Sequence, residues 1–163
     1  MDSAMLMVFV SWSGERSAKL GRWIERWFPI LVPSVRVYHS GLIPPGVVWF
    51  DHIRDYMREA DVAVFCIAPD SSQSEWLNFE LGLATASGLD FSLVLTLDVE
   101  PRDLRGPLGM YLAAPFSKDT VGRFLRHIAD KAGFDKLSLD RSLEEQWPRM
   151  LEDAQEFLTD GQV

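Results

Sequence analysis

The sequence has one cysteine, three histidines and no excess of positive charge. Cys66 has no partner for a disulfide within the chain, and its place in an apolar run predicts a buried thiol in a cytoplasmic protein. The histidines, His39, His52 and His127, stand far apart, so no His/Cys cluster predicts a metal site. A net charge of -8 without a basic stripe argues against nucleic acid as the main ligand.

Long hydrophobic segments and several common enzyme motifs are also missing. No apolar segment approaches the roughly 18 residues that span a bilayer, so no membrane contact is expected. The N-terminus lacks the basic and hydrophobic regions of a signal peptide. There is no G-x-G-x-x-G after the first apolar run, no P-loop lysine motif and no G-x-S-x-G elbow. These absences argue against dinucleotide-fingerprint, P-loop and serine-hydrolase chemistry.

What the sequence does contain is a regular alternation of apolar runs and amphipathic stretches. The 163 residues, of which 47% are hydrophobic, suffice for one domain with a full core. Continuous apolar runs at 5–10 and 62–68 predict strands buried on both faces. Helical spacing between the runs predicts helices, the first of which we expect Pro29 to end. The alternation predicts a flavodoxin-like three-layer α/β sandwich, with a mostly parallel five-stranded sheet and helices on both faces.

Some element ends can also be predicted. Ser13 is a candidate N-cap of the first helix. Gly88 is the candidate C-cap of the helix that contains Glu80. Residues 110–113 predict a short edge strand. We expect residues 1–133 to form the main domain and residues 134–163 a helical extension that Pro148 kinks or splits.

The stretch from residue 71 to residue 84 is where chemistry is expected. It follows the most apolar run, as a polar loop that opens a helix, and ligands of open α/β sheets bind beyond the carboxyl ends of strands. Trp76 and Glu80 are four residues apart and therefore share one helix face. An indole beside a carboxylate can stack on a ring and bind sugar hydroxyls. The alternative is a core tryptophan and a solvated glutamate, as expected for Glu75 at the helix start.

Four blocks, in this order, resemble the TIR (Toll/interleukin-1 receptor) domain of the bacterial type. They are Val8-Phe9-Val10-Ser11-Trp12-Ser13, the loop Gly41-Leu42-Ile43-Pro44-Pro45-Gly46 with Trp49 after it, Val64-Phe65-Cys66-Ile67-Ala68-Pro69 followed by Ser74-Glu75-Trp76, and Trp76-x-x-x-Glu80. The first resembles the first-strand box and the second the BB loop. The last has the spacing that places the catalytic glutamate in NAD-cleaving members.

The resemblance implies an NAD+ glycohydrolase that releases nicotinamide and ADP-ribose, or a cyclised ADP-ribose. NAD+ is then a substrate, and no cofactor or metal is implied. Glu80 is the implied catalytic residue. The implied substrate-binding residues are Ser11, Trp12, Ser13, Ile43, Trp49, Ser74 and Trp76.

The resemblance also implies activity through self-association. The BB loop, formed by Gly41, Leu42, Ile43, Pro44, Pro45 and Gly46, would pack against a second copy. Such a head-to-tail contact can propagate into a filament. Family behaviour further implies an effector of bacterial antiviral defence, with a fused or separate sensor of a nucleotide or another infection signal.

Two other functions stay open at this point. A non-catalytic TIR adaptor would only recruit other TIR domains, and it would not need a carboxylate at Glu80. An enzyme similar to nucleoside deoxyribosyltransferases would also use a carboxylate on a ribose. Transfer to a free base instead of water would distinguish it.

Overall fold

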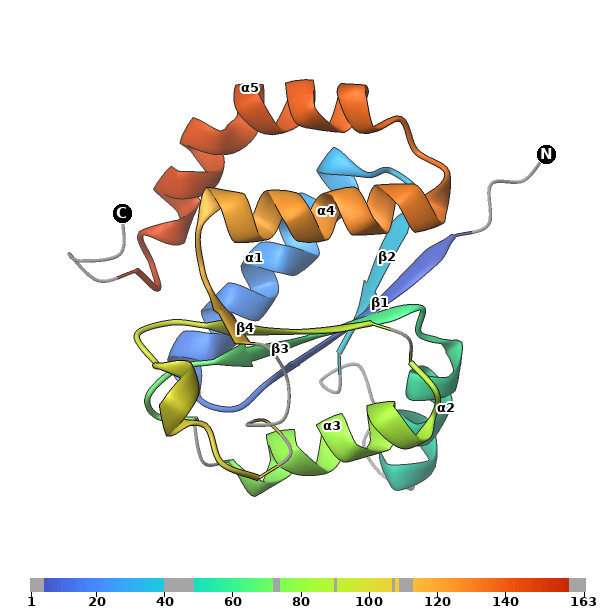
Figure 1. Cartoon of the computed structure of the whole chain (residues 1–163), viewed down its shortest axis with the longest axis vertical. Helices are drawn as coiled ribbons and strands as arrows, with labels where there is room; N and C mark the ends of the chain where they lie inside the picture. Colours follow the sequence, from blue (N-terminus) through green and yellow to red (C-terminus); the bar gives the residue numbers. More distant parts are fainter. Residues whose placement is uncertain are drawn as a thin grey trace.

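The centre of the fold is a parallel β-sheet (Figure 1). The computed structural model describes residues 5–39, 49–71, 74–89, 91–106, 108 and 113–158. Within them, five strands pair in the order β2-β1-β3-β4-β5, and every pairing is parallel. The strands are β1 (Leu6–Trp12), β2 (Val35–Tyr38), β3 (Val62–Ile67), β4 (Ser92–Thr96) and β5 (Ala113–Pro115).

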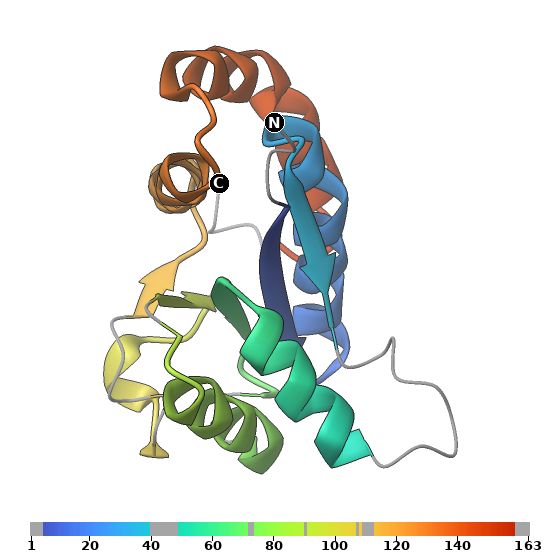
Figure 2. The ribbon, with the colours of Figure 1, turned by 90° about the vertical axis from the view of Figure 1, so that its right-hand side faces the viewer.

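Helices cover both faces of this sheet, which confirms the predicted flavodoxin-like sandwich (Figures 1 and 2). One face carries α1 (Glu15–Leu31), α4 (Lys118–Ala132) and α5 (Lys136–Ala154). The other carries α2 (Trp49–Glu59) and α3 (Glu75–Ala86), and the 3-10 turn η2 (Pro101–Asp103) lies between β4 and β5. Nowhere in the described ranges does a helix combine the length and hydrophobicity that a bilayer crossing requires.

Alternation along the strands sorts the side chains into two cores. Val8 and Val10 of β1 pack toward α1, α4 and α5, whereas Phe9 packs toward α2 and α3. All six residues of β3 are buried, so this strand is covered on both faces as its continuous apolar run predicts. The sheet face on which a side chain lies therefore decides which helices it meets.

Two predicted ends of α1 are wrong. Proline 29 does not stop the helix, which runs on to Leu31 and closes with a bond from Val32 N to Phe28 O at 2.9 Å. Pro29 removes one hydrogen bond, but its ring is compatible with helical φ this close to the end. The N-cap is Gly14 at φ 95, not Ser13. A β-carbon at Gly14 would overlap the Asp70 carboxylate. Both the positive φ and the lack of room therefore favour glycine at this position.

Other predicted ends agree with the structure or fall outside its described part. Gly88 follows α3 at φ 77, and Leu89 N donates to Ala84 O at 3.3 Å, which is a glycine-type helix end. The edge strand β5 begins at Ala113, and residues 110–112 lie outside the described residues. Helix α5 passes through Pro148 without a break, and Figure 1 shows its axis turning between the two halves.

The segment after residue 133 packs into the same core as α1 and α4. Leu139 and Met150 of α5 are completely buried in it. The indole of Trp23 donates to Met150 O at 2.9 Å, and the Trp27 indole donates to Asp153 Oδ2 at 3.0 Å. The helical part of the predicted extension thus contributes to the main core, and the continuation beyond residue 158 lies outside the described residues.

Two helical glycines give opposite expectations for the same substitution. A β-carbon at Gly21 of α1 would overlap the indole of Trp12, while one at Gly82 of α3 would meet nothing within 4 Å. Gly82→Ala should therefore raise the free energy of unfolding by about 0.5–1 kcal/mol, the usual helix-propensity gain. Gly21→Ala should lower it, because a rigid ring must move. Urea unfolding of both variants tests this, and a gain at Gly21 would contradict the packing of Trp12.

Candidate active site

The candidate site lies at the topological switch point of the sheet. From β1 the chain crosses outward to β2, whereas from β3 it continues in the other direction to β4 and β5. The carboxyl ends of β1 and β3 are adjacent there, with Ser11 paired to Phe65 and Trp12 to Cys66. Helix α3 begins just after β3 at this edge. Ligands of open α/β folds bind at such a point.

Glu80 of α3 is a fully buried carboxylate at this place in the fold. Its exposed fraction is 0%, and neither Oε1 nor Oε2 has a hydrogen-bond partner among the described residues. None of the ion pairs formed by these residues includes Glu80. A buried carboxylate normally has several partners, because loss of hydration is costly. Two open acceptor atoms are what a site that binds the hydroxyl groups of a ligand requires.

Burial changes the acid–base behaviour of Glu80. It raises the pKa of this carboxyl from 4.5 to about 7, because desolvation disfavours the charged form. The nearby donors Ser11 and Trp76 act in the opposite direction and lower the pKa by less. The carboxyl is therefore near half-ionised at neutral pH, unlike an ordinary surface glutamate.

Ser11 and Trp76 are the predicted site residues that the structure brings to Glu80. Ser11 is two residues after Phe9 on β1 and so faces the α2/α3 side of the sheet, where it is 1% exposed. Trp76 lies one turn before Glu80 and is half-buried, with its ring centroid 5.8 Å from that of Phe79. A hydroxyl, an indole and a carboxylate thus converge from two elements.

The start of α3 is fixed by local hydrogen bonds. Ser74 is the N-cap, and its Oγ accepts from Leu77 N at 3.3 Å. Glu75 lies exposed in the first turn, as expected for a charge at a helix start. Ser74 therefore has a capping role that orients the turn bearing Trp76.

Asn78 is a structural residue of this region that sequence reasoning missed. Its Oδ1 accepts from Leu108 N at 3.1 Å, and its Nδ2 donates to Ser74 O at 3.0 Å. Gly106, at φ 65, brings its backbone against the same amide. Asn78 thus ties the segment after η2 to the first turn of α3. No sequence signal identifies a contact thirty residues away.

Other predicted site residues lie apart from Glu80 or outside the described residues. Trp12 faces the opposite side of the sheet, over Gly21 of α1 and against the ring of His39 at 4.7 Å between centroids. Ser13 lies in the loop before α1, where its carbonyl accepts from Ser17 Oγ at 2.6 Å. The side chain of Trp49, at the start of α2, is outside the described part of the structure.

The whole predicted BB loop also lies outside the described residues, and this includes its predicted substrate contact. These positions are Gly41, Leu42, Ile43, Pro44, Pro45 and Gly46.

Arg16 near the switch point is already engaged. Its Nη2 forms an ion pair with Asp98 at 2.8 Å, and its Nε donates to Phe157 O at 2.7 Å. The guanidinium joins the end of β4 to the turn that follows α5. Its role in the structure is therefore to connect these segments.

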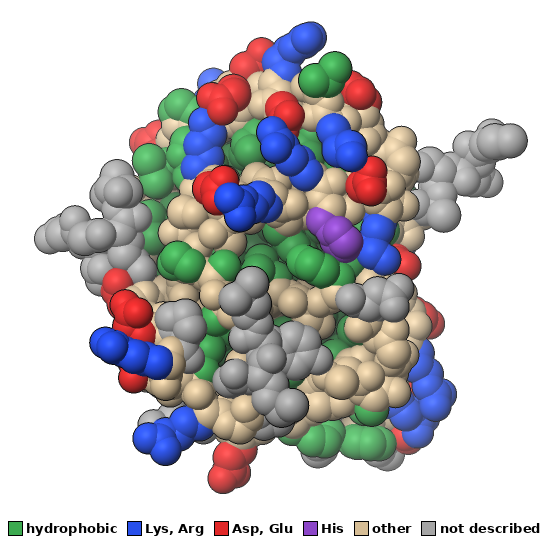
Figure 3. Space-filling model, in the orientation of Figure 1, with side chains coloured by type: hydrophobic (Ala, Val, Ile, Leu, Met, Phe, Trp, Pro, Cys, Tyr) green, Lys and Arg blue, Asp and Glu red, His purple; other side chains and the backbone are tan. Residues whose placement is uncertain are grey.

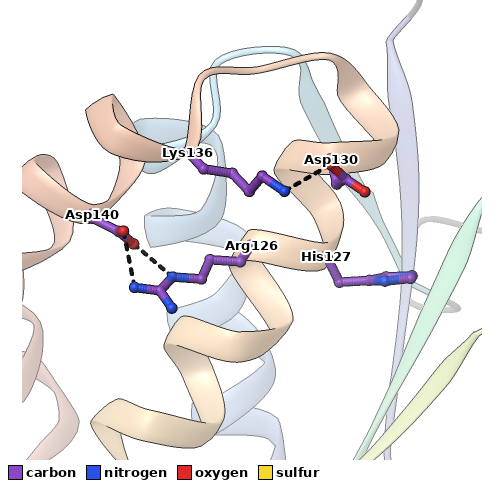
Figure 4. Close-up of a pocket in the computed structure, with 5 residues that line it drawn as sticks. All are labelled: Arg126, His127, Asp130, Lys136 and Asp140. Atoms are coloured by element: carbon purple, nitrogen blue, oxygen red, sulfur yellow. Dashed lines mark hydrogen bonds and ion pairs between the residues drawn. The ribbon is translucent and has the colours of Figure 1, made fainter.

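A separate hollow of about 450 Å³ lies between α4 and α5 (Figure 4). Its charged groups are paired with one another, Arg126 with Asp140 at 2.7 Å and Lys136 with Asp130 at 3.0 Å. His127 points away from these pairs. The hollow offers no unpaired charge for catalysis.

Figure 3 shows acidic and basic side chains mixed over α4 and α5, with no field of one sign on this face. In the described parts of the chain, no group of three His, Cys, Asp or Glu side chains can hold a metal ion.

Comparison with known proteins identifies the family. The family model "TIR domain" matches residues 8–138, which include the sheet apart from the first two residues of β1, the switch point and Glu80. Among solved structures, the TIR domains of the activated Roq1 resistosome, which directly recognises the pathogen effector XopQ, are similar at 18% identity and a TM-score of 0.48. This match covers 85% of this chain and 84% of that chain. Among curated proteins, no relative matches the sequence. The match to the family model spans most of the chain, which therefore belongs to the TIR domain family.

Proposed function

We propose that this TIR domain is an NAD+ glycohydrolase with Glu80 as its catalytic residue. The observation that carries the proposal is the carboxylate itself, fully buried at the switch point with both oxygens open. A protein that only recruits other TIR domains gains nothing from such a group, which lowers stability when it ionises. A site that must bind the hydroxyls of a sugar needs acceptors of this kind.

The chemistry requires little beyond one carboxylate. The C1′–N bond of NAD+ breaks, its electron pair leaves with neutral nicotinamide, and water adds at C1′ and releases a proton. Because the leaving group is cationic in the substrate, no general acid is needed. Positive charge develops on the ribose in an oxocarbenium-like transition state. A carboxylate that accepts from the ribose hydroxyls stabilises that charge, and charge-assisted bonds are stronger than neutral ones.

The surroundings of Glu80 support this role. The half-buried indole of Trp76 offers a flat apolar surface beside the carboxylate, suited to a ring of the substrate. Low polarity around Glu80 strengthens its interaction with a developing cation. Because the ionised form is the reactive one, activity should rise as pH increases through about 7. Ser11, Ile43, Trp49 and Ser74 complete the proposed substrate-binding set around Glu80, while Trp12 and Ser13, which lie apart from Glu80, would contact a more distant part of NAD+.

Self-association is part of the same proposal. The BB loop would contact a second copy, and a head-to-tail arrangement of this kind extends into filaments. Dependence on assembly would keep the isolated domain nearly inactive until a fused or separate sensor brings copies together. A cytoplasmic effector of antiviral defence would need such control, since loss of NAD+ is harmful to the cell.

The test is NAD+ turnover by purified protein, free and clustered on a multivalent support, with products separated by chromatography. Nicotinamide release is expected, and the second product distinguishes ADP-ribose from its cyclic form. Transfer to an added free base in preference to water would favour a transferase. If neither free nor clustered protein consumes NAD+, the adaptor function replaces the enzyme.

A further inference from the structure

Ser11 is an unusual polar residue in an otherwise apolar strand interior. The strand runs Leu6–Trp12, and the preceding residue on the same face, Phe9, is completely buried. Ser11 is buried as well, yet its Oγ has no hydrogen-bond partner among the described residues. A buried hydroxyl without a partner lowers stability, so an apolar residue would serve the fold better.

Other buried serines of the described chain have clear structural partners. Ser17 Oγ donates to Ser13 O at 2.6 Å, and Ser71 Oγ donates to Ala68 O at 3.2 Å while it accepts from Ala68 N at 3.0 Å. Ser11 differs from them because the group that it faces is Glu80, whose oxygens are equally open. Two unsatisfied polar groups therefore face each other across the gap between β1 and α3.

We propose that Ser11 is a positioning residue for Glu80: its hydroxyl donates to one oxygen of the ionised carboxylate and leaves the other oxygen for the ribose. This inference rests on the proposed function, because the ionised carboxylate is the state that the reaction uses. A carboxylate held at one oxygen has a fixed plane, which orients the second oxygen toward the substrate. The hydroxyl would act through Glu80 rather than on the reacting atoms.

The acid–base behaviour of Glu80 is consistent with this role. Burial raises the pKa of Glu80, and the nearby donors Ser11 and Trp76 lower it by less. Both groups are uncharged. The sheet side contributes Ser11 and α3 contributes Trp76, and no charged side chain is among the causes of the shift. Removal of the Ser11 hydroxyl should therefore raise the pKa of Glu80 further.

The test is the pH dependence of kcat/KM for NAD+ in wild type, Ser11→Ala and Ser11→Thr. In Ser11→Ala the acidic limb should move upward by about one pH unit, the effect expected for one bond to a charged group. Ser11→Ala should keep a larger fraction of wild-type activity at pH 9, where Glu80 is ionised in both proteins, than at pH 7, and Ser11→Thr should restore the wild-type midpoint. Thr96→Val is the matched control, because it removes another buried hydroxyl on the same sheet face, two strands from β1. Its midpoint should be unchanged.

Urea unfolding of the same variants across pH gives a second readout that needs no turnover. The pH at which stability levels off follows the pKa of Glu80, so Ser11→Ala should move it upward as well. An unchanged midpoint in either readout, or a loss of activity that is equal at every pH, overturns the role of Ser11. If wild type consumes no NAD+, the proposed function fails, and the unfolding series alone decides whether Ser11 interacts with Glu80.

Discussion

Glu80→Gln should make the protein more stable at pH 8 while it leaves stability at pH 4 nearly unchanged. The pKa of Glu80 is 4.5 when exposed and about 7 in the fold, so the folded state holds the proton more tightly than the unfolded state. The stability that comes from protonated Glu80 is fully present below pH 4.5 and is lost as pH rises through 7. Glutamine has the same shape and does not ionise.

The expected gain at pH 8 is about 3 kcal/mol, from 1.36 kcal/mol for each pKa unit. Urea unfolding of wild type and Glu80→Gln at pH 4, 6 and 8 would measure it. Glu75→Gln is the matched control, since Glu75 is an exposed carboxylate five residues earlier on the same helix, and its variant should follow wild type. A difference between Glu80→Gln and wild type that stays constant with pH would contradict the burial of this carboxyl.

A gain in stability would show that the folded structure does not require the Glu80 carboxylate. A residue whose substitution raises the free energy of unfolding is typical of a functional position. The same variant is expected to remove NAD+ cleavage. Opposite effects on stability and on activity in one substitution would be hard to explain by a structural role alone.

Leu139→Ala should destabilise the protein by about 2–5 kcal/mol, whereas Leu137→Ala should change stability by less than about 0.5 kcal/mol. Both leucines lie in the first turns of α5, but Leu139 is 0% exposed in the shared core and Leu137 is 73% exposed. The two variants remove the same atoms from one helix. Equal effects would mean that α5 does not pack on α1 and α4 in solution.

The Leu139 result also bears on where the folded unit ends. Helix α5 buries Met150 against the Trp23 indole and forms ion pairs with α4, among them Lys118 with Glu144 at 2.7 Å. A chain cut at residue 133 would expose this apolar surface of α1 and α4. Assays of the domain should therefore include α5.

The main strands and the position of Glu80 on a helix follow from sequence patterns that are local. Continuous apolar runs identify β1 and β3, and the spacing from Trp76 to Glu80 sets both on one helix face. The burial of Glu80 could not be predicted in this way, because it depends on β1 and α3 coming together. A lone glutamate on a helix has the same local sequence whether it is solvated or buried.

Features missed from the sequence involve contacts between distant segments. Trp12 follows Ser11 directly, but successive strand residues point to opposite faces, so Trp12 meets Gly21 and His39 instead of Glu80. The N-cap is Gly14 and not Ser13, and the Asp70 carboxylate leaves no room for a side chain at residue 14. Both outcomes depend on tertiary packing that no local motif encodes.

The most direct test of the central claim is the rate of nicotinamide release from NAD+ at pH 8 by clustered wild type, Glu80→Gln and Glu75→Gln. Equal folding of the three proteins is verified by urea unfolding at the same pH. We predict turnover by wild type and Glu75→Gln, and a loss of at least about 100-fold in Glu80→Gln, the scale expected when one electrostatic stabiliser is removed. Turnover by folded Glu80→Gln at the wild-type rate would contradict the account, and the buried carboxylate would then need another explanation.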